Sequence, residues 1–197
     1  MLKNYINKGV PIEGIGMQFH AFSTYEDNKL LYNAVRQLDI FELYSEFNLP
    51  IHLSEVSIPS YSNEKEDEEI QAELVKRMIT LWFSQKNVNS VVWWNLVDKT
   101  AYEGENKFHA GLIRNDMTLK PAYKILDELI NKKWHTEFTT KSKSGKVCFN
   151  GFYGDYEIEV EANGRKTVQK LSFYKDNTGY FHHINSDYGM RSKKITI

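Results

Sequence analysis

The sequence predicts an α/β fold over residues 1–135, followed by a small antiparallel β domain over residues 136–197. In the first part, short apolar runs alternate three times with longer amphipathic stretches. This alternation is typical of parallel strands joined by crossover helices. In the second part, short strand patterns are separated by turn residues. The length of 197 residues is enough for one domain or for a domain and a half.

Three strands are expected in the first part. Residues 12–20 form a short strand pattern that contains two glycines, and residues 51–56 form a second one after Pro50. Residues 90–94 are an almost continuous apolar run. Such a run favours a strand that is covered on both faces.

Three helices are expected between and after these strands. Residues 28–47 have helical spacing, and the acidic run at residues 64–69 favours a solvated start of the next helix, where negative charge suits the helix dipole. Pro121 occupies a first-turn position of the third helix. The apolar faces expected for the three helices are Leu31, Val35, Leu38 and Phe41; Val75, Met78, Ile79 and Trp82; and Ala122, Ile125, Leu126 and Leu129.

The β domain is expected to be a sandwich. Asn163-Gly164 is a strong hairpin signal, because both residue types tolerate a positive φ angle. Residues 156–160 alternate with period two, as a half-buried strand does. The other expected strands are residues 146–149, 168–174, 180–184 and 194–197.

Composition excludes several classes of partner. The chain has 25 basic and 26 acidic residues, so its charge gives no reason to expect nucleic acid or an anionic membrane. No apolar run has the length of a transmembrane helix, and the N-terminus has no apolar core of signal-peptide length. The single Cys148 permits no intrachain disulfide, and no Cys or His cluster has metal-ligand spacing, since His182 and His183 point to opposite faces of a strand. We therefore expect no metal and no cofactor.

Glu55 is the first candidate catalytic residue, because it lies at the carboxyl end of its strand, the end that faces the active site in α/β barrels. Simple alternation places Ile51, Leu53 and Glu55 on one face, with His52 and Ser54 on the other. An acidic group at the tip of an apolar row is costly unless it is used or paired. The alternative is a solvated carboxylate at the end of a strand.

Two neighbouring strands bring further polar and aromatic candidates. Gln18 and His20 share a face with the two glycines, and His20 can donate a hydrogen bond to Glu55. Trp94 ends the third strand and is followed by polar residues. A structural role for His20 and core packing for Trp94 are the alternatives.

Together, these strand ends resemble glycoside hydrolase family 10, the endo-β-1,4-xylanases. Residues 14–20 match the Gly-Ile-Gly-x-Gln-x-His motif of the family's sixth barrel strand. Residues 54–57 occupy the place of its Thr-Glu-Leu-Asp motif, and residues 94–98 that of its Trp-Gly-x-x-Asp motif. The resemblance covers roughly residues 9–136 and implies strands six to eight of a TIM (β/α)8 barrel.

The resemblance implies a role for each candidate. Glu55 falls on the nucleophile of a retaining, double-displacement hydrolysis of xylan, and His20 on the histidine that hydrogen-bonds it. Gln18 and Trp94 fall on residues that line the sugar site next to the cleaved bond. Tyr102 falls near a second tryptophan of the family.

Two residues depart from the family pattern. The aspartate that fixes the histidine is Ser57 here, so we expect His20 to lose its orienting partner. Asn95 replaces a glycine and adds bulk beside Trp94.

The resemblance also implies that one catalytic group lies elsewhere. The family's acid/base glutamate follows an asparagine at the end of the fourth strand, and nothing before Gly14 supplies it. Asn63-Glu64 is interpreted as a solvated helix start. We therefore expect strands one to five to lie outside this chain, and the open sheet to be covered by an N-terminal barrel half or by self-association.

The sequence thus predicts part of a retaining endo-β-1,4-xylanase. The alternatives are a non-catalytic xylan-binding or structural remnant of such an enzyme. Export is expected from the resemblance to polymer-degrading enzymes. The tail resembles the small β domain appended to some family members, in which the rings of Phe152, Tyr153 and Tyr156 either bind glycan or, as we favour, pack in a core.

Overall fold

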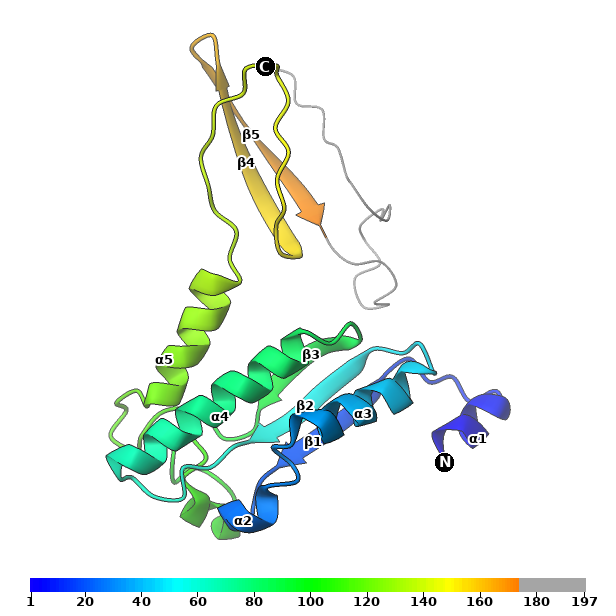
Figure 1. The fold of residues 1–197 in the computed structure, drawn as a ribbon, viewed down its shortest axis with the longest axis vertical. Coiled ribbons are helices and arrows are strands. Elements are labelled where there is room, and N and C mark those ends of the chain that lie inside the picture. The colour runs from blue at the N-terminus through cyan, green and yellow to red at the C-terminus, as the bar shows by residue number, and fades with distance from the viewer. Residues whose placement is uncertain (174–197) are drawn as a thin grey trace. The chain divides into compact units, whose positions relative to one another are not determined.

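A computed structural model describes residues 1–173 and divides the chain into two compact units (Figure 1). The first unit is Met1–Lys133, and the second begins at Trp134. The boundary expected from the sequence, between residues 135 and 136, lies two residues further along the chain.

The first unit is built on a three-stranded parallel sheet in the order β1-β2-β3. Its strands are β1 (Ile15–His20), β2 (Ile51–Ser57) and β3 (Val88–Trp93). Helix α3 (Ala34–Ser45) connects β1 to β2, and α4 (Lys65–Phe83) connects β2 to β3 (Figure 1). The short helices α1 (Leu2–Asn7) and α2 (Tyr25–Asn28) precede and follow β1. The predicted α/β organisation of this part is confirmed.

Helix α4 supplies most of the helical side of the core. The predicted stripe of Val75, Met78, Ile79 and Trp82 is buried, so this prediction is confirmed. The Trp82 ring contacts the Phe19 ring of β1 at a centroid distance of 5.0 Å, in an edge-to-face arrangement that aromatic pairs prefer. Helix α4 is thereby fixed on the sheet that carries the candidate site.

The helix predicted for residues 28–47 is wrong at its start and on its buried face. Helix α3 begins only at Ala34, because Asn33 caps it by accepting the backbone N–H of Arg36. Val35 is 66% exposed, whereas Gln37 is buried beside Phe41. The amide of Gln37 donates to the carbonyl of Leu31 and accepts from the Trp82 indole, so a polar side chain occupies the core position.

Strand β3 is not covered on both faces, contrary to the prediction. Val91 and Val92 are exposed. Within residues 1–173, β3 pairs with β2 alone and β1 pairs with β2 alone, so both outer strands have an unpaired edge. The apolar run was correctly assigned to a strand, but the described residues do not cover both of its faces.

The first unit ends in helix α5 (Pro121–Glu128) and the π-helical turn η2 (Leu129–Lys133). Pro121 occupies the first turn as predicted. Ala122 and Leu129 are buried, and the rest of the predicted apolar face is half-buried. The loop between β3 and α5 contains the 3-10 helix η1 (Glu103–Phe108).

In the second unit, the described residues form one antiparallel pair, β4 (Gly154–Ala162) and β5 (Arg165–Phe173). The hairpin prediction is confirmed, with φ angles of 53° at Asn163 and 72° at Gly164. The strand predicted at residues 146–149 is wrong, because that segment is irregular. The strands predicted at residues 180–184 and 194–197 lie outside the described residues, so the sandwich stays a prediction.

Tyr32 provides a prediction for alkaline solution. Its hydroxyl is buried, its ring lies 6.0 Å from that of Phe19, and burial raises its pKa. The phenol therefore stays protonated in the folded chain while it ionises above pH ~10 in the unfolded chain, so stability falls as the pH rises beyond that value. Tyr32→Phe should lack this loss. Urea unfolding at several pH values checks this. The difference in the free energy of unfolding between variant and parent should be constant below pH ~10. Above that pH the variant should gain stability relative to the parent, by at most about 1.4 kcal/mol per pH unit.

Candidate active site

The carboxyl ends of β1 and β2 bring three of the predicted residues together around Glu55. Gln18 donates from Nε2 to Glu55 Oε1 at 2.9 Å, and His20 Nε2 lies 3.0 Å from Glu55 Oε2. The side chains of His20 and Glu55 are 19% and 26% exposed. Each carboxylate oxygen thus has one fixed donor, and the group remains open to solvent on one side.

Glu55 does not share a face with Ile51 and Leu53, contrary to the alternation argument. Ile51 and Leu53 are buried. The β1–β2 register shifts at this point, with Met17 opposite Leu53 but Gln18 opposite Glu55, so one extra residue of β2 bulges out. A β-bulge turns the following side chain to the other face, and this one directs Glu55 toward Gln18 and His20.

Ser57 provides the orienting partner that His20 was expected to lose. The Ser57 hydroxyl, which is buried, lies 3.1 Å from His20 Nδ1. Because an ionised Glu55 can only accept, His20 Nε2 carries the hydrogen of their bond. The hydroxyl of Ser57 then donates to Nδ1 of a neutral imidazole or accepts from an imidazolium. Ser57 therefore orients His20 in either charge state, whereas an ionised aspartate would favour the imidazolium.

If Glu55 is the nucleophile that the family resemblance implies, Ser57→Ala should slow its reaction with an activated glycoside by about tenfold, the usual effect of losing one hydrogen bond of about 1.4 kcal/mol. The cause is the loss of the Nδ1 partner, which leaves His20 free to rotate away from Glu55. The rate of covalent modification followed by mass spectrometry measures this. Equal rates for the variant and the parent chain would show that the serine does not orient His20.

Aromatic rings surround the imidazole. The Trp94 ring meets the His20 ring edge-on at a centroid distance of 5.9 Å, and the Phe22 ring stacks on the His20 ring at 4.9 Å. The backbone N–H of Trp94 donates to the carbonyl of Val56 at 2.9 Å, which extends the pairing of β2 and β3 beyond Glu55. Trp94 is 45% exposed, so its side chain is not buried in a core.

Tyr102 is the one predicted site residue that is not part of this cluster. It is 79% exposed, and within residues 1–173 no ring or side-chain contact joins it to Glu55, His20 or Trp94. Asn95 does more than add bulk beside Trp94, because its amide donates to Glu105 at 3.3 Å.

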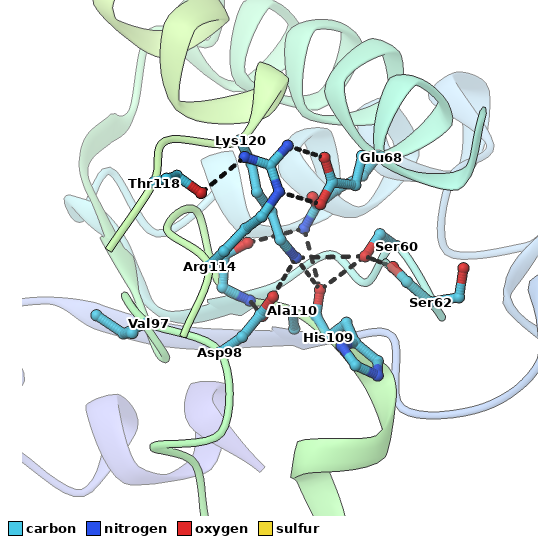
Figure 2. A network of polar contacts seen from close by, with 12 residues as sticks. Ser60, Ser62, Glu68, Val97, Asp98, His109, Ala110, Arg114, Thr118 and Lys120 are labelled. Atoms are coloured by element: carbon cyan, nitrogen blue, oxygen red, sulfur yellow. Dashed lines mark hydrogen bonds and ion pairs between the residues drawn. The ribbon is translucent and has the colours of Figure 1, made fainter. Parts of the chain in front are cut away.

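A buried ion pair lies within the segment between β3 and α5, and its lysine also bonds to Ser60 in the loop that follows β2 (Figure 2). Lys120 Nζ lies 2.7 Å from Asp98 Oδ2, and both side chains are buried. Lys120 also donates to the carbonyl of His109 at 2.8 Å and to the hydroxyl of Ser60 at 3.3 Å. Burial lowers the pKa of Lys120, and Asp98 opposes that shift. The second oxygen of Asp98 accepts the N–H of Gly111, where a side chain would clash with Asp98.

A second ion pair beside this network corrects the interpretation of the acidic run. Glu68 is only 2% exposed, and its two carboxylate oxygens accept hydrogen bonds from Nε and Nη2 of Arg114 (Figure 2). Next to it, Gln71 donates to the carbonyls of Ile58 and Gly111. The sequence signal was present, since Glu68 lies about two helical turns before Val75 and so falls in line with the apolar stripe, but its partner Arg114 is 46 residues away.

The described part of the chain contains no group of three or more side chains suited to bind a metal ion. None of its helices has both the length and the apolarity needed to cross a lipid bilayer.

The family model for glycosyl hydrolase family 10 matches residues 1–129. The chain belongs to this family. The match includes all three parallel strands and the whole Glu55 cluster. Proteins similar to this chain include the endo-1,4-beta-xylanase B of Thermotoga neapolitana, which is 26% identical over 68% of this chain and 38% of its own length. The xylanase 10B of Thermotoga petrophila, solved in complex with xylobiose, is 26% identical with a TM-score of 0.53, over 68% of this chain and 40% of its own.

A third relative is a regulatory protein by name. The anti-sigma-I factor RsgI6 of Acetivibrio thermocellus is 26% identical over 81% of this chain and 19% of its own length. That match extends beyond the first unit, which contains 133 of the 197 residues. The chain thus spans less than half of each of these relatives.

Proposed function

We propose that this chain supplies the nucleophile Glu55 to a retaining endo-β-1,4-xylanase. The observation that carries the proposal is the carboxylate of Glu55 at the carboxyl end of β2, with Gln18 on one oxygen and His20 on the other. Membership of family 10 and a solved relative that contains xylobiose support xylan as the substrate class.

The geometry suits a double displacement. An oxygen of Glu55 attacks the anomeric carbon, the bond from that carbon to the leaving oxygen breaks, and a covalent glycosyl–enzyme forms. Gln18 and His20 fix the carboxylate before the attack, which lowers the entropic part of the barrier. Water then attacks the same carbon, and Glu55 leaves as a carboxylate.

The reaction needs a second carboxyl group about 5–5.5 Å away, which protonates the leaving oxygen and later activates the water. Within residues 1–173, the polar partners of Glu55 are Gln18 and His20, and neither is an acid. We infer that the acid/base comes from a barrel segment that pairs with the open edges of β1 and β3, so that the three strands take the places of strands six to eight of the barrel.

Hydrolysis of xylotetraose tests this proposal. The chain alone is expected to be inactive, and addition of the N-terminal segment of the Thermotoga petrophila xylanase 10B that the chain does not cover should produce xylobiose. Light scattering measured on the same samples distinguishes a heterologous complex from self-association. Turnover by the chain alone would disprove the need for a second segment.

A second candidate is xylan binding without catalysis, in a polypeptide with a regulatory role. The match to an anti-sigma factor over 81% of this chain favours it. Calorimetric titration with xylotriose distinguishes catalysis from binding alone. Binding that is accompanied by neither hydrolysis nor covalent modification, with or without the complementary barrel segment, supports this second candidate. For either function we propose an extracellular location, where the polymer is found.

A further inference from the structure

The loop after β3 contains a carboxylate that contacts the exposed aromatic wall of the site. Glu105 Oε2 accepts the indole N–H of Trp94 at 2.9 Å and the amide of Asn95 at 3.3 Å. Two donors from consecutive residues therefore meet on one oxygen. Hydrogen bonds to an ionised acceptor are the stronger kind.

The loop that carries Glu105 is itself fixed. Asn106 donates to the carbonyl of Ala101 at 3.1 Å and accepts the Ala101 N–H at 3.0 Å. The N–H of Glu105 donates to the carbonyl of Tyr102 at 2.8 Å. These bonds close the segment from residue 101 to residue 106 into a compact turn, so the carboxylate is presented from a defined backbone position.

The indole of Trp94 has little else to define its orientation. Its backbone is fixed by the bond to Val56, but the side chain is 45% exposed, and its one aromatic contact within residues 1–173 is the edge-on contact with His20. An exposed indole samples several rotamers unless its N–H is engaged. Glu105 engages it in the orientation that leaves the ring beside His20 and Glu55.

We propose that Glu105 is a positioning residue, which holds the indole of Trp94 in the orientation that stacks on the sugar ring next to Glu55. This inference deepens the proposed function and rests on it for the identity of the ligand. Glu105 itself takes no part in bond making or breaking.

The test compares Glu105→Ala and Glu105→Gln with a control, Glu103→Ala, an exposed acidic residue in the same 3-10 helix. The indole cross-peak of Trp94 in a ¹H–¹⁵N spectrum, assigned by its loss in Trp94→Phe, reports the hydrogen bond directly. Calorimetry with xylotriose, in the presence of the complementary barrel segment, reports its effect on binding.

Glu105→Ala should move the Trp94 indole peak and raise the Kd for xylotriose by about tenfold, as expected for loss of a bond to a charged acceptor. Glu105→Gln should lie between the alanine variant and the parent chain in both measurements, because its amide oxygen accepts the same bond without the charge, and Glu103→Ala should change neither. An unmoved peak in Glu105→Ala, or a glutamine variant that behaves like the alanine variant, would overturn the proposal. Absence of xylotriose binding by the parent chain would instead reject the proposed function, while the peak positions still decide the role of Glu105.

Discussion

Glu55→Gln is expected to lower two rates by on the order of 10⁴-fold or more, as removal of a catalytic nucleophile does. They are the rate of covalent modification by an activated xylobioside and the rate of turnover by the reconstituted enzyme. The amide cannot attack the anomeric carbon, yet it keeps the size of the carboxyl group and can still accept from His20. Xylotriose binding should therefore change little. Initial rates from mass spectrometry and Kd values from calorimetry measure the two effects separately.

The matched control is Glu42→Gln, which makes the same chemical change at an exposed position of α3. This variant should react at the rate of the parent chain. Equal modification of Glu55→Gln and the parent chain would mean that another residue is the nucleophile.

Lys120→Met is expected to destabilise the first unit by about 3–5 kcal/mol, since it leaves the buried carboxylate of Asp98 without its cation. The bonds from Lys120 to His109 and Ser60 are lost at the same time. Urea unfolding followed by circular dichroism measures the change in the free energy of unfolding.

Lys124→Met provides the control for this change. Lys124 is exposed one turn further along α5, so its replacement should alter stability by no more than about 0.5 kcal/mol. The double variant Asp98→Asn with Lys120→Met should be more stable than Lys120→Met alone, because no charge is left unpaired. A single lysine variant as stable as the parent chain would show that the ion pair contributes no net stability.

The features that follow from local periodicity could be predicted from the sequence. The buried stripe of α4 has helical spacing, and the hairpin turn at Asn163 and Gly164 depends on two adjacent residues, so both were predicted correctly. The proximity of Glu55 and His20 could be predicted because the carboxyl ends of parallel strands meet at one edge of a sheet.

The features that depend on distant partners or on register could not be predicted in this way. The bulge in β2 reverses the face of Glu55, and nothing in Ser54-Glu55-Val56 marks an inserted residue. The polar group Gln37 is buried because Trp82, 45 residues away, supplies a donor for it. Glu105 carried no signal, since its acidic side chain in a polar loop resembles any solvated residue.

The account is tested most directly by locating the covalent label left by 2,4-dinitrophenyl 2-deoxy-2-fluoro-xylobioside. Dinitrophenolate departs without protonation and fluorine slows the second step, so the label reports the nucleophile without the acid/base. The parent chain, with the complementary barrel segment present, should gain one fluoroxylobiosyl group, and peptide mapping should place it on Glu55. A label on any other residue, or no label under conditions in which xylotriose binds, would contradict the account.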